Sequence, residues 1–163
     1  MSTSDESRFE MATFAAGCFW GVEAAFGKIN GVKSTTVGYT GGHLQNPTYQ
    51  QVCSDKTGHA EAVQITYDPK IVSYEELVEV LWEIHDPTTP DRQGQDVGYQ
   101  YRSAVFYHSE DQQLATEKSK QKAQSRFAKP VVAEITPAPA FYKAEEYHQK
   151  YLEKKGRNSC IQP

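Results

Sequence analysis

The chain has 163 residues and a formal net charge of −4, without a cluster of lysines or arginines. This length suits one domain with an adequate hydrophobic core, so residues 1–163 are expected to form a single catalytic domain. The charge argues against nucleic-acid binding, which requires a basic face. No apolar run approaches the roughly 20 residues that a membrane helix needs. We therefore expect a monomeric globular protein that binds neither nucleic acid nor membrane.

The N-terminus and the cysteines predict the compartment. Residues 1–8 are polar and form an extension that does not look like a secretory leader. The three cysteines, Cys18, Cys53 and Cys160, cannot all pair within the chain, and their spacing does not match a zinc motif. A cytoplasmic location is expected, where disulfides are usually transient and catalytic.

Hydrophobic periodicity predicts alternating strands and helices along the chain. The strands are expected at residues 9–15, 32–39, 60–67, 103–107 and 131–135. The helices are expected at about 18–30, 74–84, 110–127 and 144–155, with Ser73 and Glu76 forming a capping box before the second. The last helix would lie on the surface, with residues 145–148 on a solvated face. Residues 156–163 are expected to be a flexible tail.

The order of these elements predicts the fold class. A β-α-β-β-α-β order followed by a helix, a strand and a helix favours an α/β (α+β) two-layer sandwich of the ferredoxin-like kind. Its sheet would be mixed, with helices packed on it. Two long polar loops, at about residues 41–59 and 86–98, are expected to be functional because long ordered loops in compact domains usually are.

Cys18 stands where the first predicted strand ends and the first helix begins. Unpaired N–H groups and the helix dipole favour the thiolate there, lowering a thiol pKa that starts near about 8.5. Phe19 and Trp20 follow and would give the thiol an apolar wall. The alternative is a small buried structural cysteine, which is common.

Glu61 is the candidate proton donor. In the strand predicted at residues 60–67 it alternates onto the same face as Val63 and Ile65, which have core character. A carboxyl on an apolar face is desolvated, which raises its pKa and keeps it protonated near neutrality. A register shifted by one residue would instead leave Glu61 at a solvated strand end.

These residues alone indicate a thiol-based redox or transfer enzyme. A thiol peroxidase would share the reactive cysteine without needing an apolar pocket or a buried acid. An acyl-transfer enzyme would need a histidine base, for which His59 is the sequence candidate. A third alternative is a non-catalytic module that binds methionine-containing peptides through Phe19 and Trp20.

Four segments together resemble the A-type peptide methionine sulfoxide reductases: residues 17–21 (GCFWG), 47–49 (PTY), 58–61 (GHAE) and 94–103 (GQDVGYQYRS). The resemblance runs from about residue 12 to residue 151. It implies reduction of the S epimer of methionine sulfoxide, free or in proteins, to methionine. It also implies that the enzyme uses no cofactor beyond a dithiol reductant such as thioredoxin.

The resemblance implies catalytic roles for matching residues. Cys18 would attack the sulfoxide sulfur and become a sulfenic acid, while Glu61 would protonate the oxygen. Tyr49 and Tyr101 would donate hydrogen bonds to that oxygen, and Asp96 would lie near the nucleophile and the substrate.

The resemblance also implies a methyl pocket and a route back to the reduced enzyme. Phe19 and Trp20 match the aromatic wall that receives the S-methyl group. Cys160 is expected to resolve the sulfenic acid as a disulfide, which thioredoxin then reduces. Cys53 could resolve it equally well on sequence alone, but the family usually carries a non-essential cysteine at that position. Cys160 is therefore the predicted resolver.

Overall fold

The computed structural model describes residues 9–54 and 56–154. The extension 1–8 and the predicted tail 156–163, with Cys160, lie outside them. Its elements in chain order are β1 (Glu10–Ala16), α2 (Phe19–Gly27), β2 (Val32–Thr40), α3 (Tyr49–Cys53), β3 (Ala60–Tyr67), α4 (Tyr74–Ile84), β4 (Arg92–Gln93), β5 (Asp96–Val97), η1 (Tyr99–Tyr101), β6 (Ser103–Tyr107), α5 (Glu110–Gln124), β7 (Glu134–Pro137), β8 (Phe141–Lys143), η2 (Glu146–His148) and α6 (Tyr151–Lys154).

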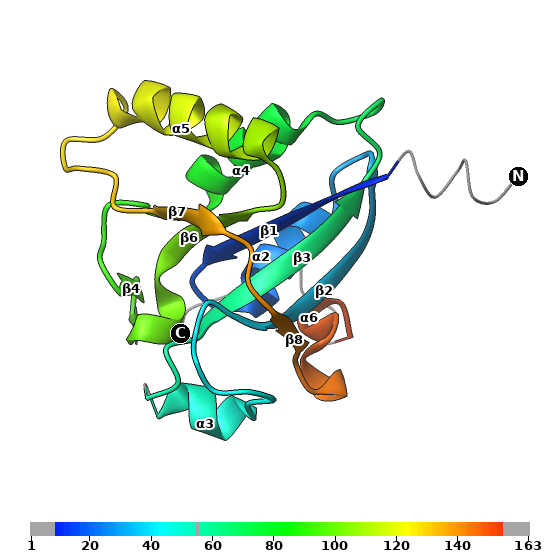
Figure 1. Cartoon of the computed structure of the whole chain (residues 1–163), viewed down its shortest axis with the longest axis vertical. Coiled ribbons are helices and arrows are strands. Elements are labelled where there is room, and N and C mark those ends of the chain that lie inside the picture. The colour runs from blue at the N-terminus through cyan, green and yellow to red at the C-terminus, as the bar shows by residue number, and fades with distance from the viewer. Residues whose placement is uncertain (1–8, 55, 155–163) are drawn as a thin grey trace, which may run out of the picture.

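Within the described residues, six strands form one mixed sheet in the order β7-β6-β1-β3-β2-β8 (Figure 1). The central strand β1 pairs antiparallel with β3 on one side and β6 on the other. Strand β7 is parallel to β6, and β8 is antiparallel to β2. The order β6-β1-β3-β2 is that of a ferredoxin-like sandwich, which confirms the predicted fold class.

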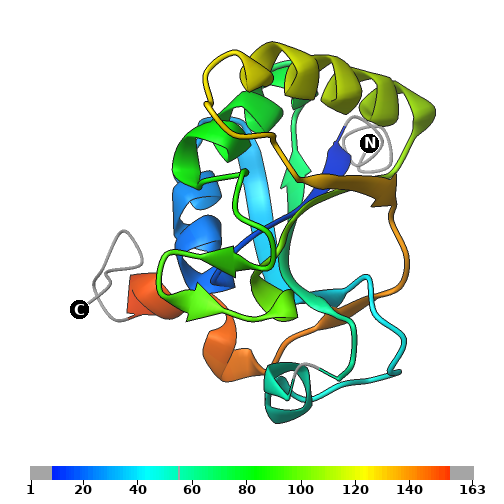
Figure 2. The ribbon, with the colours of Figure 1, turned by 90° about the vertical axis from the view of Figure 1, so that its left-hand side faces the viewer.

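Helices α2 and α4 cover one face of the sheet, and α5 packs beside α4 (Figure 2). Alternate strand residues such as Phe14 and Val63 meet these helices in the main core. The ring of Phe14 stacks on that of Phe26 at 5.3 Å between centroids. Burying side chains of this size stabilises the fold by about 1.5–3 kcal/mol each, which fixes α2 against the sheet.

The other face is lined by small residues and crossed by the chain between β7 and β8 (Figure 2). Phe141 packs there against a cluster that includes Ala62 and Ala104. Residues 138–140 thus carry the chain from one edge of the sheet to the other. Gly38 lets β8 approach β2, since a Cβ at Gly38 would lie 2.5 Å from the carbonyl oxygen of Tyr142.

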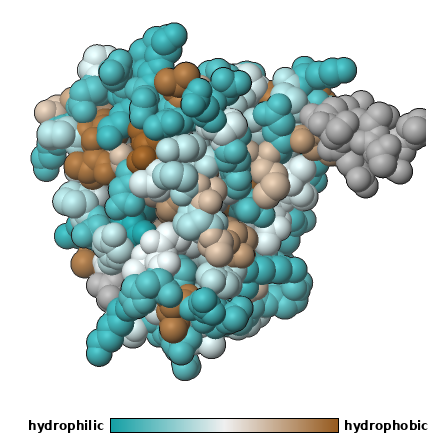
Figure 3. Space-filling view, viewed as in Figure 1, coloured by the Kyte–Doolittle hydropathy of each residue, from teal (hydrophilic) through white to brown (hydrophobic). Residues whose placement is uncertain are grey.

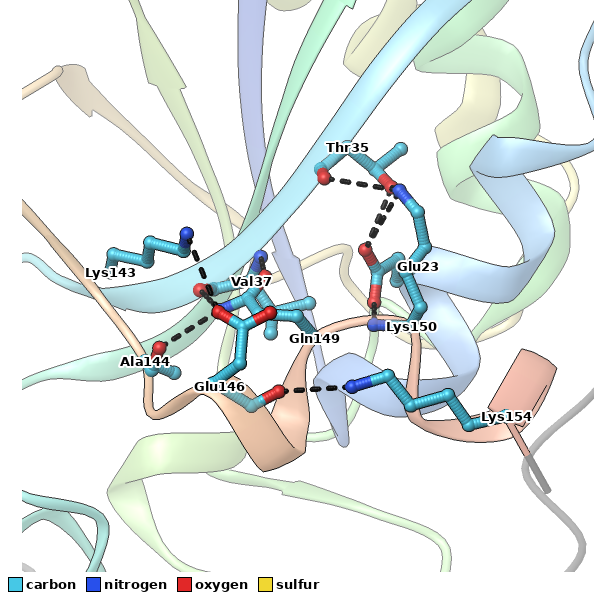
Figure 4. Close-up of polar contacts among 9 residues, drawn as sticks. All are labelled: Glu23, Thr35, Val37, Lys143, Ala144, Glu146, Gln149, Lys150 and Lys154. Carbon is cyan, nitrogen blue, oxygen red and sulfur yellow. Dashed lines mark hydrogen bonds and ion pairs between the residues drawn. The ribbon is translucent and has the colours of Figure 1, made fainter.

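The prediction of a surface helix at residues 144–155 is wrong. Residues 144–154 follow β8 and form the single turn η2 and the four-residue α6, and Gln149 contacts the edge of β2. The side-chain amide of Gln149 accepts from the N–H of Val37 at 3.0 Å and donates to its carbonyl at 2.9 Å (Figure 4). These hydrogen bonds pair the backbone N–H and carbonyl of Val37 at the edge of β2. Lys150 has a φ of 56°, which an α-helix excludes.

Other boundaries differ less from the prediction. Strands β3 and β6 coincide with the predicted ranges, and the Ser73–Glu76 capping box is present in both directions. Helix α5 ends at Gln124, before the predicted 127, and β7 begins at Glu134 instead of residue 131. Helix α3 was not predicted.

The surface facing the viewer in Figure 3 is mostly hydrophilic, with separate apolar patches. No helix among the described residues is long and apolar enough to cross a membrane.

Candidate active site

Cys18 occupies the N-cap of α2, as the sequence predicted. Its backbone (φ −58°, ψ 120°) is not helical, and its carbonyl accepts from the N–H of Val22 at 3.4 Å. Gly17 makes the turn from β1 with a φ of +96°, which strongly favours glycine. The partly exposed thiol therefore lies at the positive end of the α2 dipole, where a thiolate is favoured.

Glu61 contacts the first residue of α2, next to Cys18. It is 1% exposed, and its Oε1 accepts the N–H of Phe19 at 3.2 Å. It lies opposite Tyr39 of β2, on the face that carries the main core, so the predicted register is confirmed. Burial in this apolar setting favours the neutral acid, whereas the hydrogen bonds it accepts favour the carboxylate.

Gln100, which sequence reasoning missed, connects the second long loop to Glu61. Its Nε2 donates to Glu61 Oε2 at 2.8 Å and contacts Cys53 Sγ at 3.5 Å. Arg102 fixes this loop, because its guanidinium lies 3.9 Å from the Tyr99 ring centroid and donates to the Tyr99 carbonyl at 3.0 Å. Gln100 lies within the motif at residues 94–103, but its role depends on Glu61, which lies 39 positions away in the chain.

Tyr49 and Tyr101 come from different parts of the chain, and both lie within the electrostatic influence of Glu61. Tyr49 begins α3 and Tyr101 ends η1, and both side chains are half-buried. Burial first, and then the negative charge of Glu61, raises the pKa of each hydroxyl above its usual value. Both therefore remain protonated hydrogen-bond donors across the physiological range. Tyr49 also hydrogen-bonds the thiol of Cys53.

Asp96 lies on β5 of the small β4–β5 hairpin and is partly buried. Burial raises the pKa of this carboxyl. The charges of Asp96, Cys53 and Cys18 add to that of Glu61 in raising the pKa of Tyr101, which places these groups within electrostatic range of its hydroxyl. The structure thus brings Asp96 to the site.

The two aromatic residues after Cys18 differ in exposure. Phe19 is 1% exposed and packs against Tyr39 at 5.8 Å between ring centroids. Trp20 is partly exposed, stacks on Tyr151 at 3.8 Å, and donates its indole N–H to His148 Nδ1 at 2.9 Å. Trp20 is therefore the accessible part of the wall, and Phe19 supports it from the core.

Glu145 and His148 contact the site, so the prediction of a solvated helix face for residues 145–148 is wrong. Glu145 Oε1 accepts the hydroxyl of Tyr39 at 2.8 Å, and its Oε2 accepts the N–H of Tyr49 at 2.9 Å. These hydrogen bonds outweigh desolvation and lower the pKa of Glu145. His148 is fully buried. Their partners lie 96 to 128 positions away, beyond any local signal.

The structure places one of the two candidate resolving cysteines. Cys53 ends α3 at the edge of the site and is exposed, in contact with Tyr49 and Gln100. Cys160 lies outside the described residues. The described residues also contain no group of three or more His, Cys, Asp and Glu side chains able to hold a metal ion.

A thiol at a helix N-terminus, a buried carboxyl beneath it and two protonated tyrosines define a cysteine-dependent enzyme with acid assistance. The family described as "Peptide methionine sulfoxide reductase" matches residues 10–162. The chain belongs to the peptide methionine sulfoxide reductase family and is an oxidoreductase with that activity.

Individual relatives agree with this family. The chain is 58% identical over 156 residues to the peptide methionine sulfoxide reductase MsrA of Methanothermobacter thermautotrophicus, covering 94% of this chain and 92% of that one. Reduced Mxr1 from Saccharomyces cerevisiae superposes with a TM-score of 0.89 at 34% identity, covering 96% and 94% of the two chains. Mxr1 in complex with Trx2 gives a TM-score of 0.66 at 30% identity, covering 90% and 87%.

Proposed function

We propose that this enzyme reduces the S epimer of methionine sulfoxide, free or within oxidised proteins, through Cys18 and Glu61. The observation that carries the proposal is the bond between the Phe19 N–H and Glu61 Oε1. It ties a buried carboxyl to the residue that follows the nucleophile. An acid fixed beside the residue that follows the nucleophile is what a sulfoxide requires, because the sulfoxide oxygen leaves only after protonation.

The reaction follows from these positions. The Cys18 thiolate forms a bond to the sulfoxide sulfur while Glu61 gives its proton to the oxygen. As the protonated oxygen passes to the Cys18 sulfur, both the S–O bond and the newly formed bond between Cys18 and the sulfoxide sulfur break. Methionine leaves with the S–O electron pair, Cys18 becomes a sulfenic acid and Glu61 is left as a carboxylate. Attack by a second thiol then forms a disulfide and releases water.

The tyrosines and Trp20 support the same step. Tyr49 and Tyr101 donate hydrogen bonds to the oxygen as it gains negative charge. Removal of one such donor in another enzyme cost about 2.7–4 kcal/mol. The S-methyl group gains from burial against the indole of Trp20, at roughly 25 cal/mol per Å² of apolar area.

Cys160 is the proposed resolving thiol, with thioredoxin as the reductant of the resulting disulfide. The complex between the similar protein Mxr1 and Trx2 supports this reductant. Cys53 is the alternative, because its thiol lies against Tyr49 and Gln100. We propose that the enzyme acts as a monomer and needs no other cofactor.

A single-turnover assay without reductant, using separated R and S epimers, tests the whole scheme. We expect one methionine per enzyme from the S epimer alone, with two thiols lost in the wild type. Cys160→Ser should lose one thiol, and the matched control Cys53→Ser should still lose two. If neither epimer yields methionine, the proposal is wrong. A Cys18–Cys53 disulfide after one turnover would overturn the role of Cys160.

A further inference from the structure

His148 lies at the centre of the aromatic residues that surround the site. Its ring centroid is 4.4 Å from that of Tyr49, 5.2 Å from Phe19, 5.6 Å from Trp20 and 4.1 Å from Tyr147. Three of these rings belong to residues with a proposed role in binding the sulfoxide or its methyl group. A side chain with 0% exposure in this place cannot move without disturbing them.

The polar contacts of His148 fix its tautomer. Nδ1 accepts the indole N–H of Trp20 at 2.9 Å, so a neutral ring carries its proton on Nε2. Nε2 is buried and makes no hydrogen bond to any described residue. A phenylalanine would fill similar space without leaving a buried donor unpaired, which destabilises a fold. The hydrogen bond from the Trp20 indole to Nδ1 therefore explains a histidine at this position better than packing does.

The backbone that carries His148 is anchored on both sides. Before it in the chain, Glu145 accepts the N–H of Tyr49. After it, the side chain of Gln149 accepts the N–H of Val37 (Figure 4). The N–H of Lys150 donates to buried Glu23 of α2 at 2.7 Å, so the segment is fixed to the helix that carries Trp20. The imidazole thus meets the indole from a rigid support.

We propose that His148 is a positioning residue, which orients the indole of Trp20 to receive the S-methyl group of the substrate. Stacking on Tyr151 fixes the plane of the indole, and the bond to Nδ1 fixes its rotation within that plane. The pocket wall is thereby completed by a segment 128 positions away in the chain. This inference rests on the proposed function in its choice of ligand, but the contact itself can be tested without it.

A matched pair of variants separates the hydrogen bond from the packing. In His148→Asn a side-chain oxygen can replace Nδ1 as acceptor, whereas His148→Leu has nearly the same size and no acceptor. For the S epimer we expect His148→Leu to raise KM about fivefold to tenfold with kcat within about twofold, the size of one lost hydrogen bond. His148→Asn should stay within about twofold of the wild type. Equal KM values for the two variants would overturn the proposal.

The indole N–H resonances give a direct readout with an internal reference. The chain has two tryptophans, and the indole N–H of Trp82 donates to Ser119 Oγ at 2.8 Å, away from the site. We expect His148→Leu to shift the Trp20 resonance toward the value of an unbonded indole and to leave Trp82 unchanged. Movement of both signals would indicate general loss of structure, and an unmoved Trp20 signal would show that Nδ1 does not hold the indole. Either result overturns the proposal.

A double-variant cycle shows whether His148 acts through Trp20. If it does, His148→Leu should change KM by less than about twofold in a Trp20→Phe background, because the two effects are not additive. A full KM increase in that background would overturn the proposal. The methionine yield of the wild type tests the proposed function separately. The indole resonances test the contact between His148 and Trp20 even if that yield is zero.

Discussion

Replacement of Glu61 by glutamine tests the acid that the mechanism needs. The two side chains have nearly the same shape, and the amide oxygen of glutamine can still accept the Phe19 N–H that lies 3.2 Å from Oε1. Its amide nitrogen, however, would meet Gln100 Nε2, which now donates to Oε2 at 2.8 Å. Gln100 must then turn its oxygen toward residue 61 and lose its contact with Cys53.

The structural effect of this change is small beside the expected kinetic effect. Loss of one net hydrogen bond lowers the free energy of unfolding by about 1 kcal/mol, which corresponds to a Tm decrease of about 2–4 °C. A positioned general acid contributes about 10²–10⁴ in rate, or roughly 3–5 kcal/mol of activation free energy. Glu61→Gln should therefore remain folded while methionine formation slows by two orders of magnitude or more.

The assay is single-turnover methionine formation from the S epimer between pH 5 and pH 10, with a thermal melt of each protein. In the wild type, one methionine per enzyme should form rapidly, whereas Glu61→Gln should form it at least a hundredfold more slowly at every pH tested. The exposed Glu75→Gln on α4 is the matched control and should behave as wild type. A rate for Glu61→Gln within tenfold of wild type would refute the assignment of Glu61 as the acid.

Three further predictions concern stability. Glu23 is 3% exposed and accepts from Thr35 Oγ1 and the Lys150 N–H, both at 2.7 Å, so Glu23→Leu should lower the urea-derived free energy of unfolding by about 3 kcal/mol and Glu23→Gln by about 1 kcal/mol. Equal losses would contradict the role of these bonds. Burial lowers the pKa of His85 from 6.5 to about 4, so its stability contribution is complete above pH 6.5. Between pH 6.5 and pH 4 the unfolded chain binds the proton first, and about 3 kcal/mol should be lost as pH falls. In His85→Gln this part of the pH dependence should disappear, and a slope equal to that of the wild type would count against it. Gly38→Ala should lower the free energy of unfolding by about 1–3 kcal/mol because its Cβ would lie 2.5 Å from the Tyr142 carbonyl oxygen of β8, and an unchanged stability would show that β8 shifts freely.

Local patterns predicted those parts of the molecule whose causes are local. The alternation of residues 60–67 placed Glu61 on the core face, since a strand has a side-chain period of two. The Ser73–Glu76 pattern marked the start of α4, because the two residues satisfy each other's backbone groups. The same pattern in Thr48 and Gln51 begins α3, so that helix could have been found from the sequence.

The sequence by itself thus determined the ferredoxin-like order of elements, the cysteine at a helix N-terminus and the face on which its acid lies. Only the tertiary structure decided the course of residues 144–154, because their hydrogen bonds go to a strand edge and to α2 far away in the chain. For the same reason Gln100 and His148 were not recognised as part of the site. Each is recognised by its partner, Glu61 or Trp20, and the fold alone brings these partners within hydrogen-bonding distance.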